Sequence, residues 1–172
     1  MSRIIIFITL ALGLAGCTTL NQGGSGSVSK SESMTVLPFL NNTETPYAAD
    51  RAEAIVVALL QAGGFSHVEQ YQAVAKEEEP SLDRGVKRRA DALAWARQRN
   101  VRYCVTGVVN EWRYKVGLDG EPVAGFTLQV MELPEGKVIW SATGGKSGWS
   151  RDAVSAVAQQ VIANMVDAIP VR

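Results

Sequence analysis

From residue 34 onward, apolar positions follow two different spacings that alternate along the chain. Short apolar runs and apolar–polar alternation predict strands, whereas apolar residues at i, i+3, i+4 and i+7 predict helices. Strands are predicted at 34–40, 66–74, 101–116, 123–133 and 138–143, and helices at 45–62, 83–99 and 150–169. The order β-α-β-α-β-β-β-α predicts one compact α+β domain. Its mixed, largely antiparallel sheet of about five strands is expected to carry helices on one face.

Turn and capping residues set the expected boundaries of these elements. Thr45 is the predicted N-cap of the first helix and Ser150 that of the last, because their hydroxyls can accept from free backbone N–H groups. Asp119-Gly120 is the strongest hairpin signal in the chain. Residues 144–148, GGKSG, are expected to form a flexible loop. The 101–116 strand is apolar on both faces near its start, which predicts a central position in the sheet.

The N-terminus has the pattern of a lipoprotein signal peptide. Arg3 supplies a positive charge, and the apolar run of residues 4–14 is shorter than the roughly 20 residues that a membrane-spanning helix needs. Ala15-Gly16 then places small residues directly before Cys17, as in a bacterial lipobox. Residues 1–16 are therefore predicted to be cleaved, and Cys17 to carry S-diacylglycerol and N-acyl (palmitate-type) chains. The alternative is an ordinary signal peptide with a chance cysteine.

Residues 17–33 are interpreted as the lipidated cysteine and a Gly/Ser-rich tether, and residues 34–172 as a periplasmic domain. A flexible chain of this tether's length reaches about 20–25 Å. Thr18, rather than an aspartate, follows Cys17, and this pattern favours sorting to the outer membrane over retention at the inner one. Lipid anchoring by several acyl chains would be stable.

Composition argues against several function classes. The chain has 17 basic and 17 acidic residues, and removal of residues 1–16 takes away only Arg3, which leaves a net charge of −1. This balance does not favour nucleic-acid binding, which needs a basic surface. One His and two Cys leave little stock for a metal site or a histidine-based triad, so a non-enzymatic protein without metal or further cofactor is predicted. Cys104, in an apolar strand, is expected to be a buried thiol.

Few residues stand out as candidate sites. The GGKS sequence at 144–147 fails as a phosphate loop because Trp140 occupies the position of the first glycine. Glu111, Glu121 and Glu132 in the predicted meander, like Asp119 in its turn, are expected to be solvated carboxylates rather than an acid–base pair. His67 is expected at a surface or strand edge.

Trp149 allows two interpretations. It can staple onto Val154 at the start of the last helix, or it can stand exposed at a membrane or protein interface. Asp119 likewise gains a functional meaning only in an oligomer. A ring of subunits would repeat its carboxylate and focus a negative potential in a channel.

Four segments together resemble one family over essentially the whole chain. They are the lipobox with Cys17, VLPFLNNTETPYAADRAEAIVVALL (36–60), VTGVVNEWRYKVGLDGEP (105–122) and WSATGGKSGW (140–149). In their joint order and in overall length they resemble the PelC family, the outer-membrane lipoproteins of the Pel exopolysaccharide secretion system in biofilm matrix formation.

The resemblance implies a non-catalytic, ring-forming secretion component, a dodecamer on the periplasmic side of the outer membrane. Its implied partners are a β-barrel porin with a tetratricopeptide scaffold and a cationic amino-sugar polysaccharide, which an acidic inner surface would guide to the barrel. By position, Asp119 matches the pore-lining acidic loop, Trp149 the membrane-facing aromatic residue and Cys17 the lipid attachment site. The alternative is a monomeric, lipid-tethered activator or assembly factor of another envelope protein.

Overall fold

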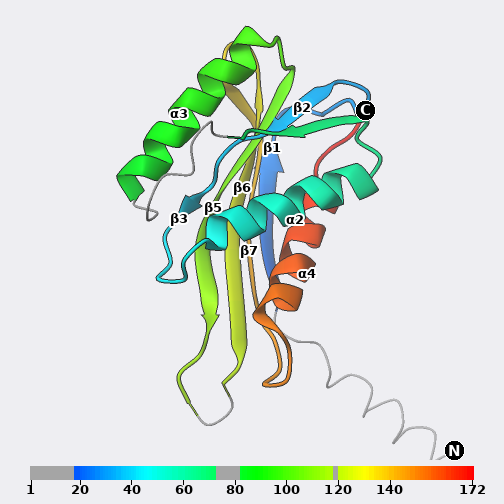
Figure 1. The fold of residues 1–172 in the computed structure, drawn as a ribbon. Coiled ribbons are helices and arrows are strands. Elements are labelled where there is room, and N and C mark those ends of the chain that lie inside the picture. The colour runs from blue at the N-terminus through cyan, green and yellow to red at the C-terminus, as the bar shows by residue number, and fades with distance from the viewer. Residues whose placement is uncertain (1–17, 73–81, 118–119) are drawn as a thin grey trace, which may run out of the picture.

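The computed structural model describes residues 18–72, 82–117 and 120–172. Within them lies one seven-stranded mixed sheet with the path β1-β7-β6-β5-β2-β4, and β3 pairs with β5 beside that path (Figure 1). The strands are β1 (Thr18–Gly24), β2 (Ser33–Val36), β3 (Leu40–Asn41), β4 (His67–Gln70), β5 (Tyr103–Tyr114), β6 (Pro122–Glu132) and β7 (Lys137–Ser147). The helices are α2 (Ala48–Ala62), α3 (Leu82–Gln98) and α4 (Val154–Asp167). The α+β class and the central place of β5, between β6 and β2, are confirmed.

The predicted tether is the largest difference from expectation. Residues 18–24 form β1, which pairs antiparallel with β7 from Thr18 opposite Lys146 to Gly24 opposite Trp140. Val28 is fully buried; its N–H donates to Pro170 O at 2.8 Å, and its carbonyl accepts from Arg172 N at 3.0 Å. The expectation of a flexible tether at 17–33 is therefore wrong for residues 18–33, which belong to the folded domain.

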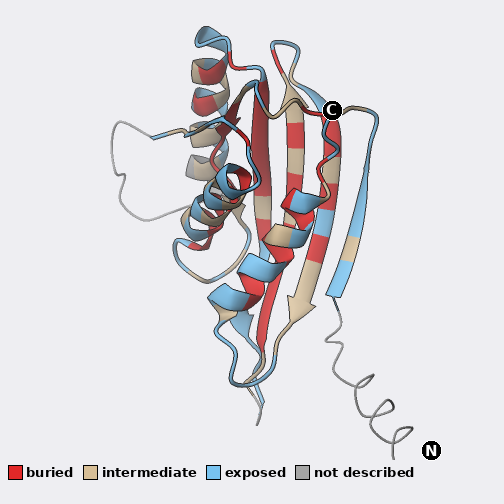
Figure 2. Cartoon of the chain, turned by 90° about the vertical axis from the view of Figure 1, so that its right-hand side faces the viewer, coloured by how far each residue is buried: buried red, intermediate tan, exposed pale blue. Residues whose placement is uncertain are grey.

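Helices cover both faces of the sheet, not one. The larger core cluster lies under α2 and α4 and takes alternate residues of β6: Ala124, Phe126, Leu128 and Val130. Figure 2 shows α4 crossing in front of these largely buried strands. A second cluster joins Ala92 and Ala96 of α3 to Leu37, Val101, Cys104 and Leu133. Because neighbouring residues of a strand point to opposite faces, Cys104 and Val105 place the two clusters on opposite sides of β5.

Both predicted N-caps are wrong. The α2 helix begins at Ala48 after Tyr47, which has a left-handed φ of 58°, and Thr45 Oγ1 instead donates to the Trp112 carbonyl at 2.5 Å. The α4 helix begins at Val154 after Ala153, so Ser150 lies outside it. In both cases the connection from strand to helix is longer than predicted. A capping pattern depends on neighbouring residues alone and cannot indicate the length of such a connection.

The expected loop at 144–148 is also wrong for most of its length. Gly144 to Ser147 continue β7, paired with β6 on one side and, as far as Lys146, with β1 on the other. Conversely, the predicted 34–40 strand is divided into β2 and β3 around Pro38, which cannot donate a ladder hydrogen bond. The predicted 66–74 strand is shorter, since β4 ends at Gln70.

Candidate membrane-facing end and polar cavity

One end of the sheet carries the neighbours of all three predicted site residues. Thr18, which directly follows Cys17, is paired with Lys146, and Ser147 is paired with Val123 near the start of β6. Trp149 comes two residues after the end of β7. Cys17 and Asp119 themselves lie outside the described residues. Figure 1 shows the start of β1, the β5–β6 hairpin and the β7–α4 connection at the same end of the molecule.

Hydrogen bonds hold the β7–α4 connection against the base of the hairpin. Gly148 N–H donates to Pro122 O at 2.8 Å, and Val154 N–H donates to the Tyr114 hydroxyl at 3.2 Å. A side chain at Gly148 would not fit, because its Cβ would lie 2.5 Å from Val157 Cγ2. Trp149 therefore stands on a segment with a defined position.

Trp149 is exposed, which decides between its two interpretations. Its side chain is 61% exposed, and α4 begins five residues later, so it does not staple onto Val154. Two further exposed residues of the same end are Tyr114, at 50%, and Val116, at 101%. We call Tyr114, Val116 and Trp149 the apolar end. Aromatic side chains beside aliphatic ones favour a membrane–water interface or a protein interface.

The glutamates of the meander are paired with basic side chains. Glu111 accepts from Arg113 at 2.7 Å, Glu121 from Lys115 at 2.8 Å and Glu132 from Arg102 at 2.5 Å. Such exposed pairs stabilise a fold by about 0–1 kcal/mol each. These three carboxylates face solvent, as predicted. Paired in this way they add little net negative charge to the hairpin.

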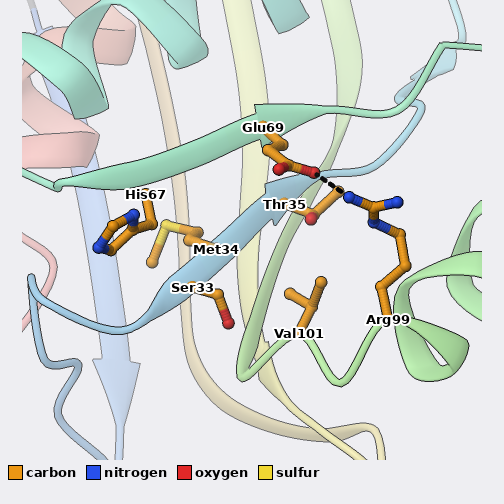
Figure 3. A pocket seen from close by; sticks show the side chains of 7 residues that line it. All are labelled: Ser33, Met34, Thr35, His67, Glu69, Arg99 and Val101. Atoms are coloured by element: carbon orange, nitrogen blue, oxygen red, sulfur yellow. Dashed lines mark ion pairs between the residues drawn. The ribbon is translucent and has the colours of Figure 1, made fainter.

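A polar cavity of about 190 Å³ lies at the opposite end of the sheet, between β2, β4 and the end of α3 (Figure 3). It is lined by Ser33, Met34, Thr35, His67, Glu69, Arg99 and Val101. Glu69 and Arg99 form an ion pair at 3.7 Å beside the cavity, and the buried Thr35 Oγ1 has no hydrogen-bond partner among the described residues. His67 is exposed on the edge strand, as expected. The cavity is smaller than the roughly 300–1,000 Å³ typical of ligand sites, so it does not suit a polymer or a large cofactor.

The chemistry of the remaining described residues is sparse. Burial raises the pKa of the Cys104 thiol to about 12, which makes it an inert core side chain, as predicted. Among the described residues, no group of three His, Cys, Asp or Glu side chains could hold a metal ion. In the same part of the chain, none of the helices combines the length and the apolar character that crossing a membrane requires.

Solved structures supply the deciding comparison. A PelC dodecamer from Paraburkholderia phytofirmans is 37% identical to this chain, covering 91% of it and 99% of the PelC chain, with a TM-score of 0.76. A second PelC dodecamer from the same organism is 36% identical, with a TM-score of 0.77 and coverage of 91% and 100%. The chain belongs to the PelC family. The expected family resemblance is thereby confirmed.

More distant likeness extends the fold beyond PelC proteins. A lipoprotein from Neisseria meningitidis has a TM-score of 0.56 at 17% identity, over 80% of this chain and 97% of its own. At that identity the likeness shows a common fold alone. No protein-family model matches the sequence, and no match is found among curated proteins.

The sequence analysis singled out Trp149 but not the rest of the apolar end, and the membrane-facing role of Trp149 stays a prediction. Tyr114 lies near the end of the predicted 101–116 strand, and its hydroxyl accepts a hydrogen bond from the start of α4. Val116 carried no signal, because a single valine beside a glycine has no periodicity. The one indication that Val116 would be exposed was its position just before the predicted Asp119-Gly120 turn.

Proposed function

We propose that this chain is a lipid-anchored, ring-forming component of Pel exopolysaccharide export at the outer membrane. In this role the ring guides a cationic amino-sugar polymer, by electrostatic attraction, toward a β-barrel exporter with a tetratricopeptide scaffold. The role requires docking and charge, and no bond is made or broken. The observation that carries the proposal is the 37% identity, over nearly the whole of both chains, to a PelC protein that forms a dodecamer.

The geometry of the apolar end supports membrane attachment at a defined orientation. Lipid on Cys17 would emerge directly before Thr18, the first residue of β1, and Thr18 is paired with β7 three residues before Trp149. Acyl chains and the apolar end would then meet the membrane together. The β5–β6 hairpin, which carries Asp119, would lie at the same level.

The second candidate, a monomeric tethered activator, loses its main physical support. That reading depends on a flexible tether long enough to reach a distant partner. Residues 18–24 are instead paired in the sheet, and Val28 is buried against the C-terminus. A domain anchored directly at Cys17 would stay close to the membrane.

Substitution at Cys17 tests the anchor. In cells that carry the Pel system, Cys17→Ser should move the full chain from the membrane fraction to the soluble periplasm. The proposal of lipidation fails if the variant stays membrane-bound to the same extent as the wild type.

Charge reversal at Asp119 tests the guiding role. Asp119→Lys should lower secreted polysaccharide while native mass spectrometry shows an unchanged oligomer, because repeated cations would repel a cationic polymer. Asp91→Lys, the same charge change at an exposed site on α3, is the matched control and should leave secretion unchanged. Equal secretion by both variants would remove Asp119 from the mechanism.

A further inference from the structure

No helix of the described residues covers one face of the sheet over β6, β7 and β1. Every second residue of β6, from Ala124 to Val130, points into the core under α4, so the residues between them point to the opposite face. On that opposite face, α3 packs beside Leu37, Cys104 and Leu133. The strand register aligns the uncovered positions in rows, such as Thr127, Thr143 and Asn21. We call this surface the open sheet face and define it by Thr19, Asn21, Gly23, Thr127, Thr143 and Gly145. A shallow depression lined by Asn21, Thr127 and Thr143 lies on it.

The six residues of the open sheet face carry no charge, while the Glu111–Arg113 ion pair of β5 borders them across Gly125. The face also contains glycines that the subunit itself does not need. Gly145 does not have a positive φ, and a Cβ on it would meet nothing closer than the Ala124 carbonyl at 3.5 Å. A Cβ on Gly23 would meet nothing within 4 Å. Glycine inside a strand costs roughly 0.5–1 kcal/mol relative to alanine. Neither a turn nor packing within the subunit requires glycine at these two positions. The close approach of another molecule to the sheet would explain them.

A second surface, made mostly of small and amide side chains, lies on the opposite side of the subunit, with the exposed Arg51 of α2 and Asp167 of α4 at its ends. The outward sides of α2 and α4, which pack side by side in Figure 1, expose Ala54, Ala58, Ser155, Ala156, Gln159 and Asn164. We call this surface the helical face. The exposed side of α3 differs, because it carries charged residues such as Lys87, Asp91 and Arg97. Small and amide side chains let two backbones approach closely, and the exposed charges of this surface are confined to Arg51, in the first turn of α2, and Asp167, at the end of α4.

A closed ring requires two different, complementary surfaces on each subunit, since a head-to-tail contact never meets its own copy. PelC dodecamers that match nearly the whole chain indicate that the occupant is a second copy. We propose that the helical face of one subunit packs on the open sheet face of the next, and that this contact repeats around the ring. The inference rests on the proposed function, because it presupposes a ring.

This arrangement also keeps every subunit in the same orientation toward the membrane. The helical face and the open sheet face lie on opposite sides of the sheet, and both run along the strands. Rotation about an axis roughly parallel to the strands therefore brings one onto the other. Each copy then presents its apolar end, with Thr18 and Trp149, on the same side of the ring.

Cross-linking between engineered cysteines tests the contact directly. The full chain has only Cys17, whose thiol is acylated in the proposed protein, and the buried Cys104. In membranes, a short bis-maleimide should link the double variant Thr143→Cys/Gln159→Cys into a ladder of dimers, trimers and larger species. Each single variant should remain monomeric on the gel, because residue 143 of one subunit faces residue 159 of the next and not its own copy.

The matched control pair is Thr143→Cys/Ala94→Cys, since Ala94 is exposed on α3. A ladder from the control pair, or from a single variant, would overturn the assignment of the faces. The assignment of the faces would also be overturned if the first pair gave no ladder while native mass spectrometry of the detergent-extracted chain still showed a large oligomer. The proposed function would stand in that case. Both proposals are overturned if the first pair gives no ladder in membranes and the detergent-extracted wild type is a monomer by native mass spectrometry.

Bulk and charge at the two faces give an independent readout. Gly145→Leu on the open sheet face and Gln159→Lys on the helical face should each reduce the native mass to that of a monomer that still unfolds cooperatively on heating. Ala94→Leu and Ala94→Lys on α3 are the controls and should keep the full oligomer. Retention of the oligomer by both face variants would contradict the proposal.

Discussion

The Glu53 carboxylate on α2 accepts a hydrogen bond of 2.8 Å from the backbone N–H of Phe39, and the Glu53 residue is 0% exposed. Gln70 Nε2 of β4 donates to the other carboxylate oxygen at 3.2 Å, and Arg88 of α3 approaches within 3.7 Å. One acidic side chain thus connects two helices, β4 and the segment that separates β2 from β3. Burial raises the pKa of Glu53 above its ordinary value of 4.5, although the hydrogen bond from Phe39 and the charge of Arg88 oppose the shift.

The raised pKa of Glu53 predicts a dependence of stability on pH. A carboxyl with a raised pKa in the folded state contributes stability fully below pH 4.5, and this contribution is lost as pH rises through the folded-state pKa. Glu53→Gln removes the titrating group while it keeps an acceptor for Phe39. Denaturant unfolding at a series of pH values should therefore show a smaller decline above pH 4.5 for the variant. Parallel profiles for variant and wild type would contradict the prediction.

Two glycines of the sheet should respond differently to alanine. A Cβ at Gly107 would lie 2.7 Å from both Phe39 Cε2 and the Thr127 carbonyl, so neighbouring strands must move. Gly107→Ala should lower the free energy of unfolding by about 1–3 kcal/mol, the usual effect of overpacking. Gly145→Ala is the matched control, with its nearest contact at 3.5 Å, and should not destabilise the subunit. Equal losses in chemical denaturation would show that the crowding at Gly107 is relieved without strain.

The buried Val28 should stabilise the segment that was expected to be a tether. Val28→Ala should lower the free energy of unfolding by about 1–2 kcal/mol and speed proteolysis between residues 25 and 32, because an apolar anchor is lost. Val116→Ala, at a side chain that is 101% exposed, is the control and should change stability by less than about 0.5 kcal/mol. Limited proteolysis followed by mass spectrometry identifies the cleavage sites. Rapid cleavage in this segment of the wild type would contradict the prediction and favour a flexible tether.

Trp149 should act at the membrane and not in the fold. Because it is 61% exposed, Trp149→Ser should change the free energy of unfolding by less than about 0.5 kcal/mol. Phospholipid vesicles should protect the wild-type chain from acrylamide quenching of its exposed tryptophan fluorescence. Trp112 and Trp140 are each 2% exposed and Trp95 is half-buried, so Trp149→Ser should reveal the background quenching of these three side chains, which is subtracted from that of the wild type. Equal quenching with and without vesicles would argue against contact between Trp149 and lipid.

Cys104 should remain unreactive in the native protein. Its thiol has a pKa raised to about 12 by burial, so little thiolate forms at neutral pH and reagents cannot reach it. In Cys17→Ser, thiol labelling at pH 8 should occur only as the chain unfolds in denaturant. Fast labelling without denaturant would show that the cluster under α3 opens readily.

Local signals predicted those parts of the fold that local physics decides. The hairpins around β6 follow from turn residues such as Asp119-Gly120 and from period-two alternation, and both were expected. The β1 strand was missed because its pairing depends on the free edge of β7, while its own sequence, TTLNQGG, is polar and rich in glycine. The Thr45 hydroxyl was expected to cap α2, but it donates a hydrogen bond to the Trp112 carbonyl, 67 residues away in the sequence.

In the candidate site, too, local sequence predicted some features, while others depend on contacts between distant segments. The exposure of Trp149 was one of two alternatives in the sequence, and the start of α4 at Val154 decided between them. The grouping of Thr18, Trp149 and the hairpin at one end follows from strand register, which depends on pairings between distant segments. The uncovered face of β6, β7 and β1 required knowledge of which helix lies on which side. The alternation of Cys104 and Val105, apolar on both faces, was the one hint that a helix lies on each.

The start of β1 at Thr18 constrains how the protein matures. If Cys17 is acylated, the bond cleaved before it lies one residue from a strand that is paired along its length with β7. Peptidases act on extended segments that are free of such pairing. We therefore expect removal of the signal peptide to precede the pairing of β1 with β7. Folding and membrane delivery would be coupled through this step, because a precursor that retained residues 1–16 would keep the edge of β7 unpaired.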